Sequence, residues 1–478
     1  MSATELIKAD IVVIGAGSGG LSVAAGAAML GLDVVLFEKA RMGGDCLNFG
    51  CVPSKALITS ARQAQSMREA GRLGIAAVQP DVDWLSVRKH VESAIAAIEP
   101  NDSVERFESL GVRVILEAAR FADTETIISE NYRVKARRIV IATGSRASTP
   151  PIPGLETVPF LTNETIFSVD ELPKRLLILG GGPIGVELGQ AFQRLGSDIT
   201  LIDRSAILPR AEPAHADIVR QKLIAEGVTL FEDADVLAVS GEAGAIELKA
   251  SRSDGTQLVL NGTHLLVAAG RTPVLDQLDL EAGNVDHTPK GIETKANLRS
   301  TSNSRVWIVG DAAGRGQFTH LAGWHASVFV RNALFKSRSK ADGLPLPAVT
   351  YCEPEMAQIG LSEHQARIQH GDDVSVSTFS FDENDRAIAE ADTVGEVKLV
   401  LRKGAVIGAS VLGAGAGDII QMLALAMSNG LKAKALTNFI SPYPTRTEAV
   451  KRAASAHFQP LVFGKWAKRL VALLQRIP

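Results

Sequence analysis

Two of the three cysteines, Cys46 and Cys51, lie five residues apart in the segment GGDCLNFGCVPSK. A thiol pair at this spacing could form a redox-active disulfide, because disulfides in reducing compartments are usually catalytic. An ideal helix would hold the two Cα atoms roughly 8 to 9 Å apart, whereas a disulfide needs about 4.4 to 6.8 Å. If the two residues are bonded, the turn between them must be distorted, and we expect Gly50 to permit this.

An apolar run followed by glycines lies just upstream of the cysteine pair. In IVVIGAGSGG the glycines Gly15, Gly17 and Gly20 follow the pattern GxGxxG, and acidic Glu38 comes eighteen residues after the last of them. The first glycine makes a tight turn, the second lets a pyrophosphate approach the N-terminus of the next helix, and the third lets that helix pack on the strand. The acid accepts hydrogen bonds from ribose hydroxyls. The pattern predicts a dinucleotide-binding Rossmann unit.

The same pattern occurs a second time. The segment LLILGGGPIGVELG repeats the three glycines of the first unit, and an acid again follows them, each 165 residues further along the chain. The residues of this second pattern are Gly180, Gly182, Gly185 and Asp203. Two Rossmann units predict two bound dinucleotides.

Three further apolar segments end in residues suited to contact a ligand. RIVIATGS and HLLVAAGRTP each follow a glycine unit, and we expect each to be a returning strand; VWIVGDAAG is a third glycine-ended strand. Ligands of parallel sheets bind at the carboxyl ends of strands. The residues at these ends that we expect to contact the cofactors are Thr143, Gly144, Gly270, Arg271, Asp311 and Ala312. The alternative for Asp311 is that it only caps the next helix.

The position of the cysteine pair indicates which nucleotide each of the two Rossmann units binds. A redox disulfide must lie beside the group that reduces it, and the cysteines closely follow the first glycine unit, so we expect FAD there and a nicotinamide nucleotide in the second unit. Asp203 would repel a 2′-phosphate and so favours NAD(H) over NADP(H). The next residue, Arg204, could partly restore binding of NADP(H).

The bulk composition limits the class of protein. At 478 residues the chain is long enough for about three domains and a sizeable core. Its 50 basic and 53 acidic residues give a net charge of −3 without a basic field, which argues against nucleic acid as a partner. Three cysteines do not make a secreted disulfide framework, so we expect a cytoplasmic protein, and we predict no metal site.

Taken together, these motifs resemble the flavoprotein pyridine nucleotide-disulfide oxidoreductases, in the order in which that family carries them. The resemblance implies an α/β homodimer with two Rossmann-like domains that bind FAD and NAD(P), followed by an α+β dimerisation domain. It places the FAD-binding domain in residues 1–150 and 275–345, the NAD(P)-binding domain in 151–274 and the interface domain in 346–478.

The resemblance also implies roles for individual residues. Cys51 would be the thiol next to the flavin and Cys46 the exposed thiol that exchanges with substrate. Lys55 and Glu187 match a lysine and a glutamate that pair beside the flavin and the nicotinamide, and a cation there stabilises a reduced, anionic flavin. The alternative for Glu187 is an ordinary acid on a helix surface. Three more residues that we expect to bind the cofactors are Lys39, Gly44 and Asp45.

The chain departs from the family near its C-terminus. Members that handle disulfides carry the motif HxHPTxxE, in which the second histidine is the acid–base group and the glutamate orients it. Here the segment is SPYPTRTE, so Ser441 and Tyr443 replace both histidines while Glu448 remains. Tyrosine, with a pKa of about 10, is a poor base at neutral pH, whereas histidine titrates near pH 6.5.

We therefore expect an enzyme that resembles dihydrolipoamide dehydrogenase, acts on a thiol or disulfide, and has an altered proton donor at Tyr443. A second hypothesis is reduction of a soft metal ion, as in mercuric reductases, although the C-terminal cysteine pair of those enzymes is missing. A third is transfer of electrons from NADH to a quinone or membrane partner.

The C-terminal segment FGKWAKRLVALLQRI alternates cations with apolar residues at helical spacing. Such a helix could lie on an anionic membrane. The expectation that we favour is a terminal helix that docks on the dimer.

Overall fold

The structure is a computed structural model that describes residues 5–477. The chain divides into two compact units, and each is described by itself. The first unit comprises the chain up to Arg62 together with Asp81–Arg204 and Phe231–Gly343. The second comprises Gln63–Pro80, Ser205–Leu230 and the chain from Leu344 onward. The three-part division expected from the sequence stays a prediction.

A seven-stranded sheet forms the centre of the first unit, with the order β3-β2-β1-β6-β5-β4 and with β18 also paired to β6. The pairs β3–β2, β2–β1, β1–β6 and β6–β18 are parallel. The pairs β6–β5 and β5–β4 are antiparallel. The strands are β1 (Glu5–Ile14), β2 (Val34–Phe37), β3 (Val112–Ile115), β4 (Arg120–Phe121), β5 (Thr126–Ile128), β6 (Tyr132–Ile141) and β18 (Val306–Ile308).

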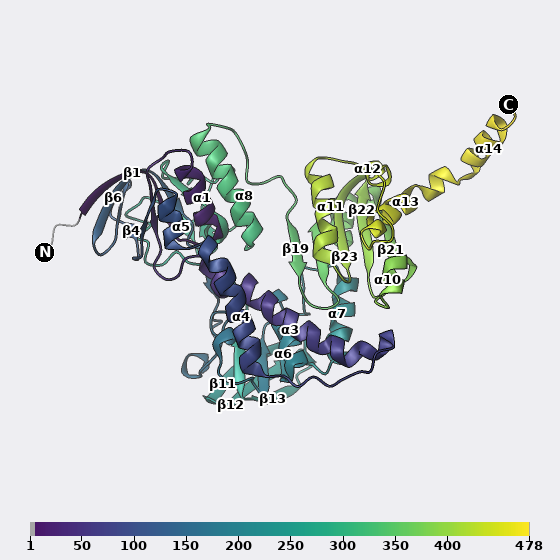
Figure 1. Cartoon of the computed structure of the whole chain (residues 1–478), viewed down its shortest axis with the longest axis horizontal. Coiled ribbons are helices and arrows are strands. Elements are labelled where there is room, and N and C mark those ends of the chain that lie inside the picture. Colours follow the sequence, from purple (N-terminus) through teal and green to yellow (C-terminus); the bar gives the residue numbers. More distant parts are fainter. Residues whose placement is uncertain (1–4, 478) are drawn as a thin grey trace. The chain divides into compact units, whose positions relative to one another are not determined.

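Alternate residues of β1 serve two different cores, because successive side chains of a strand point to opposite faces. Ile11 and Val13 pack with helices α1 (Ser18–Ala28) and α8 (Thr319–Phe329), which lie side by side in Figure 1. Val12 and Ile14 pack in the core on the opposite face. All four side chains are at most 5% exposed, which explains why this run of the sequence is continuously apolar.

The second glycine unit builds a smaller parallel sheet in which β9, β8 and β14 are neighbours. Helix α6 follows β8 directly, as α1 follows β1. The elements are β8 (Arg175–Leu179), α6 (Pro183–Leu195), β9 (Asp198–Ile202) and β14 (His264–Val267). An antiparallel sheet of β11 (Ala234–Glu242), β12 (Ala245–Arg252) and β13 (Gln257–Gly262) accompanies it.

Two short strands join the returning ends of the two glycine units. Strand β7 (Ser145–Ala147) pairs antiparallel with β15 (Arg271–Pro273), and Ser145 stands opposite Pro273. This pairing brings residues from RIVIATGS and HLLVAAGRTP together. The remaining helices and strands of this unit are α2 (Gly44–Asn48), α3 (Cys51–Glu69, which continues into the second unit), α4 (Trp84–Ile98), α5 (Val104–Ser109), β16 (His287–Thr288) and β17 (Gly291–Ile292).

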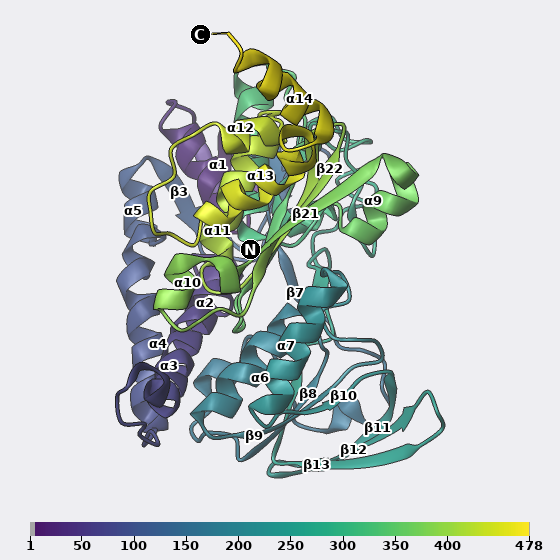
Figure 2. The same ribbon diagram turned by 90° about the vertical axis from the view of Figure 1, so that its right-hand side faces the viewer.

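The second unit contains a five-stranded antiparallel sheet with the order β19-β20-β23-β22-β21. Val397, Leu399 and Leu401 of β22 face the main core, which α11, α12 and α13 complete, whereas Val400 faces a smaller core with α9. Figure 2 shows these helices beside the sheet. The strands are β19 (Pro347–Thr350), β20 (Met356–Gly360), β21 (Val374–Ser380), β22 (Glu396–Arg402) and β23 (Ala405–Leu412). The helices are α7 (Pro213–Ala225), α9 (Glu363–His370), α10 (Asp385–Ala389), α11 (Ala416–Ser428), α12 (Ala433–Thr437), α13 (Glu448–Val462) and α14 (Lys465–Leu474).

Candidate active site

The two cysteines lie on either side of a break between helices. Helix α2 ends at Asn48 and α3 begins at Cys51, so the chain is not helical between them. A Cβ on Gly50 would lie 3.0 Å from Asp45 Oδ2 and 3.1 Å from the Asp45 carbonyl oxygen. The helix is interrupted at the glycine where a distorted turn was expected, and Asp45 leaves little room there for a side chain.

In the structure both cysteines are free thiols, and their pKa values are shifted in opposite directions. A hydrogen bond from the Cys46 thiol lowers the pKa of Cys51 to about 6 against the opposing effect of burial, and Thr319 and Lys55 add to the lowering. The same hydrogen bond, together with burial, raises the pKa of Cys46. Cys51 is the first residue of α3, where the helix dipole also favours a thiolate. The dithiol form thus has a Cys51 thiolate and a protonated Cys46.

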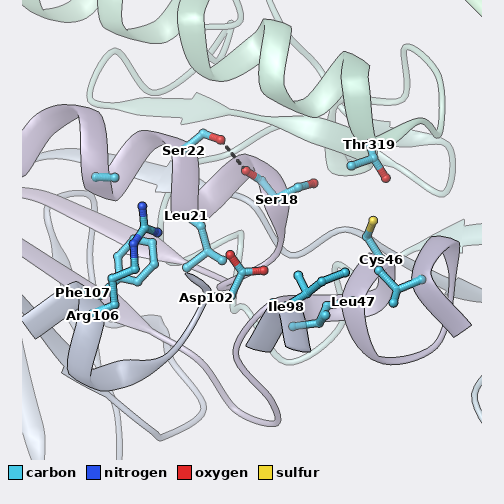
Figure 3. A pocket seen from close by; sticks show the side chains of 13 residues that line it. Ser18, Leu21, Ser22, Cys46, Leu47, Ile98, Asp102, Arg106, Phe107 and Thr319 are labelled. Atoms are coloured by element: carbon cyan, nitrogen blue, oxygen red, sulfur yellow. Dashed lines mark hydrogen bonds between the residues drawn. The ribbon is translucent and has the colours of Figure 1, made fainter. Parts of the chain in front are cut away.

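A cavity of about 380 Å³ adjoins the turn (Figure 3). Cys46 lines this cavity and Cys51 does not, although Cys51 is the more exposed of the two thiols. Figure 3 shows the Cys46 side chain and Thr319 at one end of the cavity and Arg106 with Phe107 at the other. The other residues of the lining are Ser18, Leu21, Ser22, Ala25, Gly43, Leu47, Val52, Ile98 and Asp102. We expected Cys46 to be the exposed thiol, and the structure shows Cys51 more exposed instead. The role of Cys46 as the thiol that exchanges with substrate stays a prediction.

Lys55 and Glu187 form an ion pair of 2.8 Å between α3 and α6. The Glu187 side chain is 8% exposed, so it is not an ordinary acid on a helix surface. Lys55 is one helical turn beyond Cys51, close enough to favour the Cys51 thiolate electrostatically. The pair thus links the cysteine helix to the helix of the second glycine unit.

The turn is held in place by contacts with Asp45, the residue before Cys46. Asn163, which is buried, donates one hydrogen bond to Asp45 Oδ1 (3.0 Å) and another to the Phe49 carbonyl oxygen (3.3 Å). Arg271 forms an ion pair of 3.1 Å with Asp45 Oδ2. Both oxygens of one carboxylate are therefore engaged by groups from distant parts of the sequence.

Arg271 connects this turn to Asp311. Its Nε donates to Ser145 Oγ (2.8 Å), and Ser145 Oγ donates to Asp311 Oδ2 (2.6 Å). Burial raises the pKa of Asp311, while Ser145 and Arg271 oppose that rise. Asp311 lies in the 3-10 turn Gly310–Ala313 that follows β18, at the strand end where the sequence placed it. Its side chain bonds to Ser145, so Asp311 does more than cap the next element.

The two glycine units have the same geometry. The Ala16 N–H donates to Glu38 Oε2 (2.7 Å), and the Gly181 N–H, 165 residues further on, donates to Asp203 Oδ2 (2.6 Å). A Cβ on Gly20 would lie 1.9 Å from the Gly15 carbonyl oxygen; the equivalent distance from Gly185 to Gly180 is also 1.9 Å. The third glycine of each motif is thus required by the contact of helix with strand.

The residues at both helix N-termini fit a dinucleotide. A Cβ on Gly182 would meet nothing within 4 Å, and one on Gly17 would meet only Gly44 Cα at 4.0 Å. Neither glycine has a side chain to cap its helix, and neither helix has an acid in its first turn. Backbone N–H groups at the start of α1 and α6 are therefore available to a pyrophosphate.

The other expected cofactor residues lie near these turns. Gly44 approaches Gly17 so closely that a Cβ would lie 2.6 Å from Gly17 Cα. The Thr143 hydroxyl donates to the Val274 carbonyl oxygen (2.7 Å). Lys39 is exposed and Ala312 is buried, and Gly144 and Gly270 both have positive φ. Their contacts with a cofactor stay predictions.

Tyr443 and Glu448 lie in the second unit. The Tyr443 hydroxyl donates to Asp385 Oδ2 (2.7 Å), and this hydrogen bond raises the pKa of the exposed phenol. Glu448 begins α13 and accepts a hydrogen bond from Arg452 (3.0 Å), while the Tyr443 hydroxyl bonds to Asp385. A role for Glu448 in orienting residue 443 stays a prediction. The raised pKa leaves even less phenolate at neutral pH than an ordinary tyrosine has, so Tyr443 is less available as a base.

Two residues that shape the site, Thr319 and Asn163, were not predicted from the sequence, and Ser145 was predicted only as the end of the strand RIVIATGS. Thr319 Oγ1 lies 3.4 Å from Cys51 Sγ, and Thr319 is the first residue of α8. A threonine at the start of a helix, in the segment QFTHLAGWHAS, was the available signal in the sequence.

The chain matches the family described as pyridine nucleotide-disulphide oxidoreductase over residues 9–326, and the dimerisation domain of the same family over residues 346–454. A mercuric reductase of Streptomyces lividans is 34% identical over 456 residues, which cover 93% of this chain and 95% of that protein. A dihydrolipoyl dehydrogenase of Bacillus subtilis is 32% identical over 461 residues, covering 94% and 96%. The chain belongs to the pyridine nucleotide-disulfide oxidoreductase family.

A solved structure agrees with this assignment. The HOCl-induced flavoprotein disulfide reductase RclA from Escherichia coli, determined as a Cu(II) complex, superimposes with a TM-score of 0.83 at 26% identity, covering 93% of this chain and 99% of that one. The predicted α/β fold with cofactor-binding and dimerisation domains is confirmed, as is the oxidoreductase class. Family membership implies a flavin and a pyridine nucleotide. Within residues 5–477, no helix is both long and apolar enough to cross a bilayer.

Proposed function

We propose that this protein is an FAD-dependent thiol–disulfide oxidoreductase that prefers NAD(H), is homodimeric, and is similar in activity to dihydrolipoamide dehydrogenase. The observation that carries the proposal is that the two cysteines of the turn have different surroundings. Cys46 lines a cavity large enough for a small molecule, whereas Cys51 lies beside Thr319 and Lys55, which stabilise its thiolate.

The two thiols can exchange with a disulfide substrate in two balanced steps. Cys46, once deprotonated, attacks one sulfur of the substrate, forms a mixed disulfide and releases the first substrate thiolate. The Cys51 thiolate then attacks Cys46 Sγ, which closes the Cys46–Cys51 disulfide and releases the second substrate thiolate. Both substrate thiolates take up protons, so one disulfide has been reduced to two thiols and the enzyme dithiol has been oxidised.

The bound cofactors would supply, or remove, the two electrons that interconvert the enzyme disulfide and dithiol. Gly17 and Gly182 would leave room for their pyrophosphates, and the Lys55–Glu187 pair would lie between the two binding units. Asp203 would accept the ribose hydroxyls of NAD(H) and repel a 2′-phosphate. The negative charge of Asp203 therefore favours NAD(H), whereas the positive charge of Arg204 favours NADP(H).

The cavity favours a slender disulfide with an aliphatic chain and a polar end. Leu21, Leu47 and Ile98 give it an apolar middle, while Asp102 and Arg106 provide opposite charges away from Cys46. Burial raises the pKa of Asp102. A lipoyl group, with a dithiolane at one end and an amide or acid at the other, has this arrangement.

A substrate panel tests the proposal. With anaerobic protein and NADH, we expect lipoamide to be reduced faster than glutathione disulfide, Hg(II) or a quinone, with NADPH less effective. Cys46→Ala should abolish lipoamide reduction, whereas Cys352→Ser, at a buried thiol whose Sγ lies 3.2 Å from the Pro354 carbonyl oxygen, should not. Rapid quinone reduction that survives in Cys46→Ala would overturn the proposal.

Reduction of a soft metal ion is the second candidate. Two adjacent thiols with unequal acidities form a pair of soft ligands, and mercuric reductases are among the relatives. In the same panel, NADH-dependent Hg(II) reduction that exceeds lipoamide reduction and requires both cysteines would favour this candidate.

A further inference from the structure

The last helix of the chain has an exposed apolar face. In α14 and the turn after it, the apolar side chains recur at the spacing of one helical face; they are Trp466, Leu470, Leu473, Leu474 and Ile477. All five are exposed, and no residue of α14 is buried. Trp466 is 73% exposed, although tryptophan is one of the side chains that gain most from leaving water.

Four cations border one side of the apolar face of α14. At about 100° per residue, Lys465, Lys468, Arg469 and Arg476 fall on one arc of the helix, next to the arc that holds Trp466 and the leucines, and the sequence from His457 to the end contains no Asp or Glu. The whole chain has a net charge of −3, so this concentration of positive charge does not reflect the general composition. In Figure 1 α14 extends beyond α13.

A purely structural role for this face has no support within the described residues. The segment before α14 also exposes apolar side chains: Leu461, Val462 and Phe463 are each more than half exposed. The match to the family's dimerisation domain ends at residue 454, eleven residues before α14 begins at Lys465. The helix thus lies outside the residues that match the family's dimerisation domain.

We propose that α14 binds the surface of an anionic lipid membrane. The helix would lie in the plane of the interface, with Trp466 and the leucines at the boundary of headgroups and acyl chains and with the cations among anionic headgroups. A helix of 10 residues is about 15 Å long, half of the roughly 30 Å needed to cross the hydrocarbon core, so it lies on the membrane and does not span it.

Vesicle co-sedimentation of the full-length flavin-loaded protein tests this inference. Vesicles of phosphatidylcholine mixed equally with phosphatidylglycerol should retain at least tenfold more protein than vesicles of phosphatidylcholine alone, and added salt should release it. The double variant Lys468→Glu/Arg469→Glu should lose this binding. A matched control, Lys432→Glu/Lys434→Glu, makes the same charge change at two exposed lysines of the second unit and should bind like the wild type.

A second variant separates the apolar contribution from charge. Trp466→Ser/Leu470→Ser keeps all four cations and should also lose binding, while its lipoamide reduction rate stays that of the wild type. Absence of binding by the wild type, or equal binding by tail and control variants, would overturn the inference. The inference would also be overturned if the tail variants lost the dimer in sedimentation velocity but still bound vesicles. In that case a second copy of the chain, and not a membrane, would cover α14.

Discussion

At the scale of single residues, the site depends on an unequal pair of thiols. A hydrogen bond from Cys46 stabilises the Cys51 thiolate, and the hydroxyl of Thr319 and the charge of Lys55 add to this. Below about pH 6 Cys51 is protonated, and above it the thiolate predominates. Cys46 stays protonated while Cys51 is ionised, because its proton forms the bond between them. In the proposed exchange, Cys46 therefore needs a base before it can attack the substrate.

The acidity of Cys51 can be measured by alkylation of the reduced protein. The rate of iodoacetamide labelling at Cys51, followed by peptide mass spectrometry, should rise with a midpoint near pH 6. Thr319→Val should move this midpoint up by about one pH unit, because it removes a hydrogen bond to a charged group. Thr59→Val, which removes only a hydroxyl bonded to the Lys55 carbonyl oxygen, serves as the control. A midpoint at the ordinary cysteine value of 9.0 would contradict the account.

The missing base can be restored by Tyr443→His. The hydrogen bond to Asp385 raises the pKa of Tyr443, so the phenol cannot remove a thiol proton at neutral pH. A histidine would titrate near pH 6.5, and we expect at least tenfold faster oxidation of dihydrolipoamide with a new ionisation in the pH–rate profile. Tyr443→Phe, which deletes the hydroxyl without adding a base, should give no gain. Equal rates for the His and Phe variants would show that this position does not limit the reaction.

At the scale of elements, the critical feature is the interrupted connection between α2 and α3. The sequence predicted a distortion at Gly50, because five residues of ideal helix hold two cysteines too far apart to bond. It could not predict what fixes the distortion. Asn163 lies 118 residues from Asp45, and Arg271 comes from the returning strand of the other glycine unit. Such contacts depend on tertiary packing and leave no local pattern in the sequence.

Asn163→Ala tests whether this support matters for the chemistry. Loss of two buried hydrogen bonds should reduce the free energy of unfolding by about 1 to 2 kcal/mol. Misplacement of the turn should also slow reoxidation of the reduced protein by lipoamide roughly tenfold to hundredfold. Asn131→Ala, at an exposed asparagine whose side chain and backbone N–H both bond to Glu117, is the control. An unchanged reoxidation rate with reduced stability would limit Asn163 to a structural role.

At the scale of the whole molecule, the sequence was most informative where physics imposes a repeat. Each dinucleotide unit needs the same glycines and acid, so the offset of 165 residues reappears as matching bonds from Ala16 to Glu38 and from Gly181 to Asp203. The C-terminal domain has no such fingerprint, and its assignment depended on resemblance, which the match over residues 346–454 supports. In the proposed function, the choice of substrate depends on the shape of the cavity beside Cys46, which no motif encodes.

The central claim is that the Cys46–Cys51 pair exchanges electrons with a bound flavin, and anaerobic titration with NADH tests it most directly. The wild-type protein should develop a long-wavelength charge-transfer band as the disulfide is reduced. Cys51→Ala should lose this band, because Cys51 is the proposed thiolate partner. Ordinary bleaching of the flavin in the wild type, with no such band at any NADH concentration, would contradict the account.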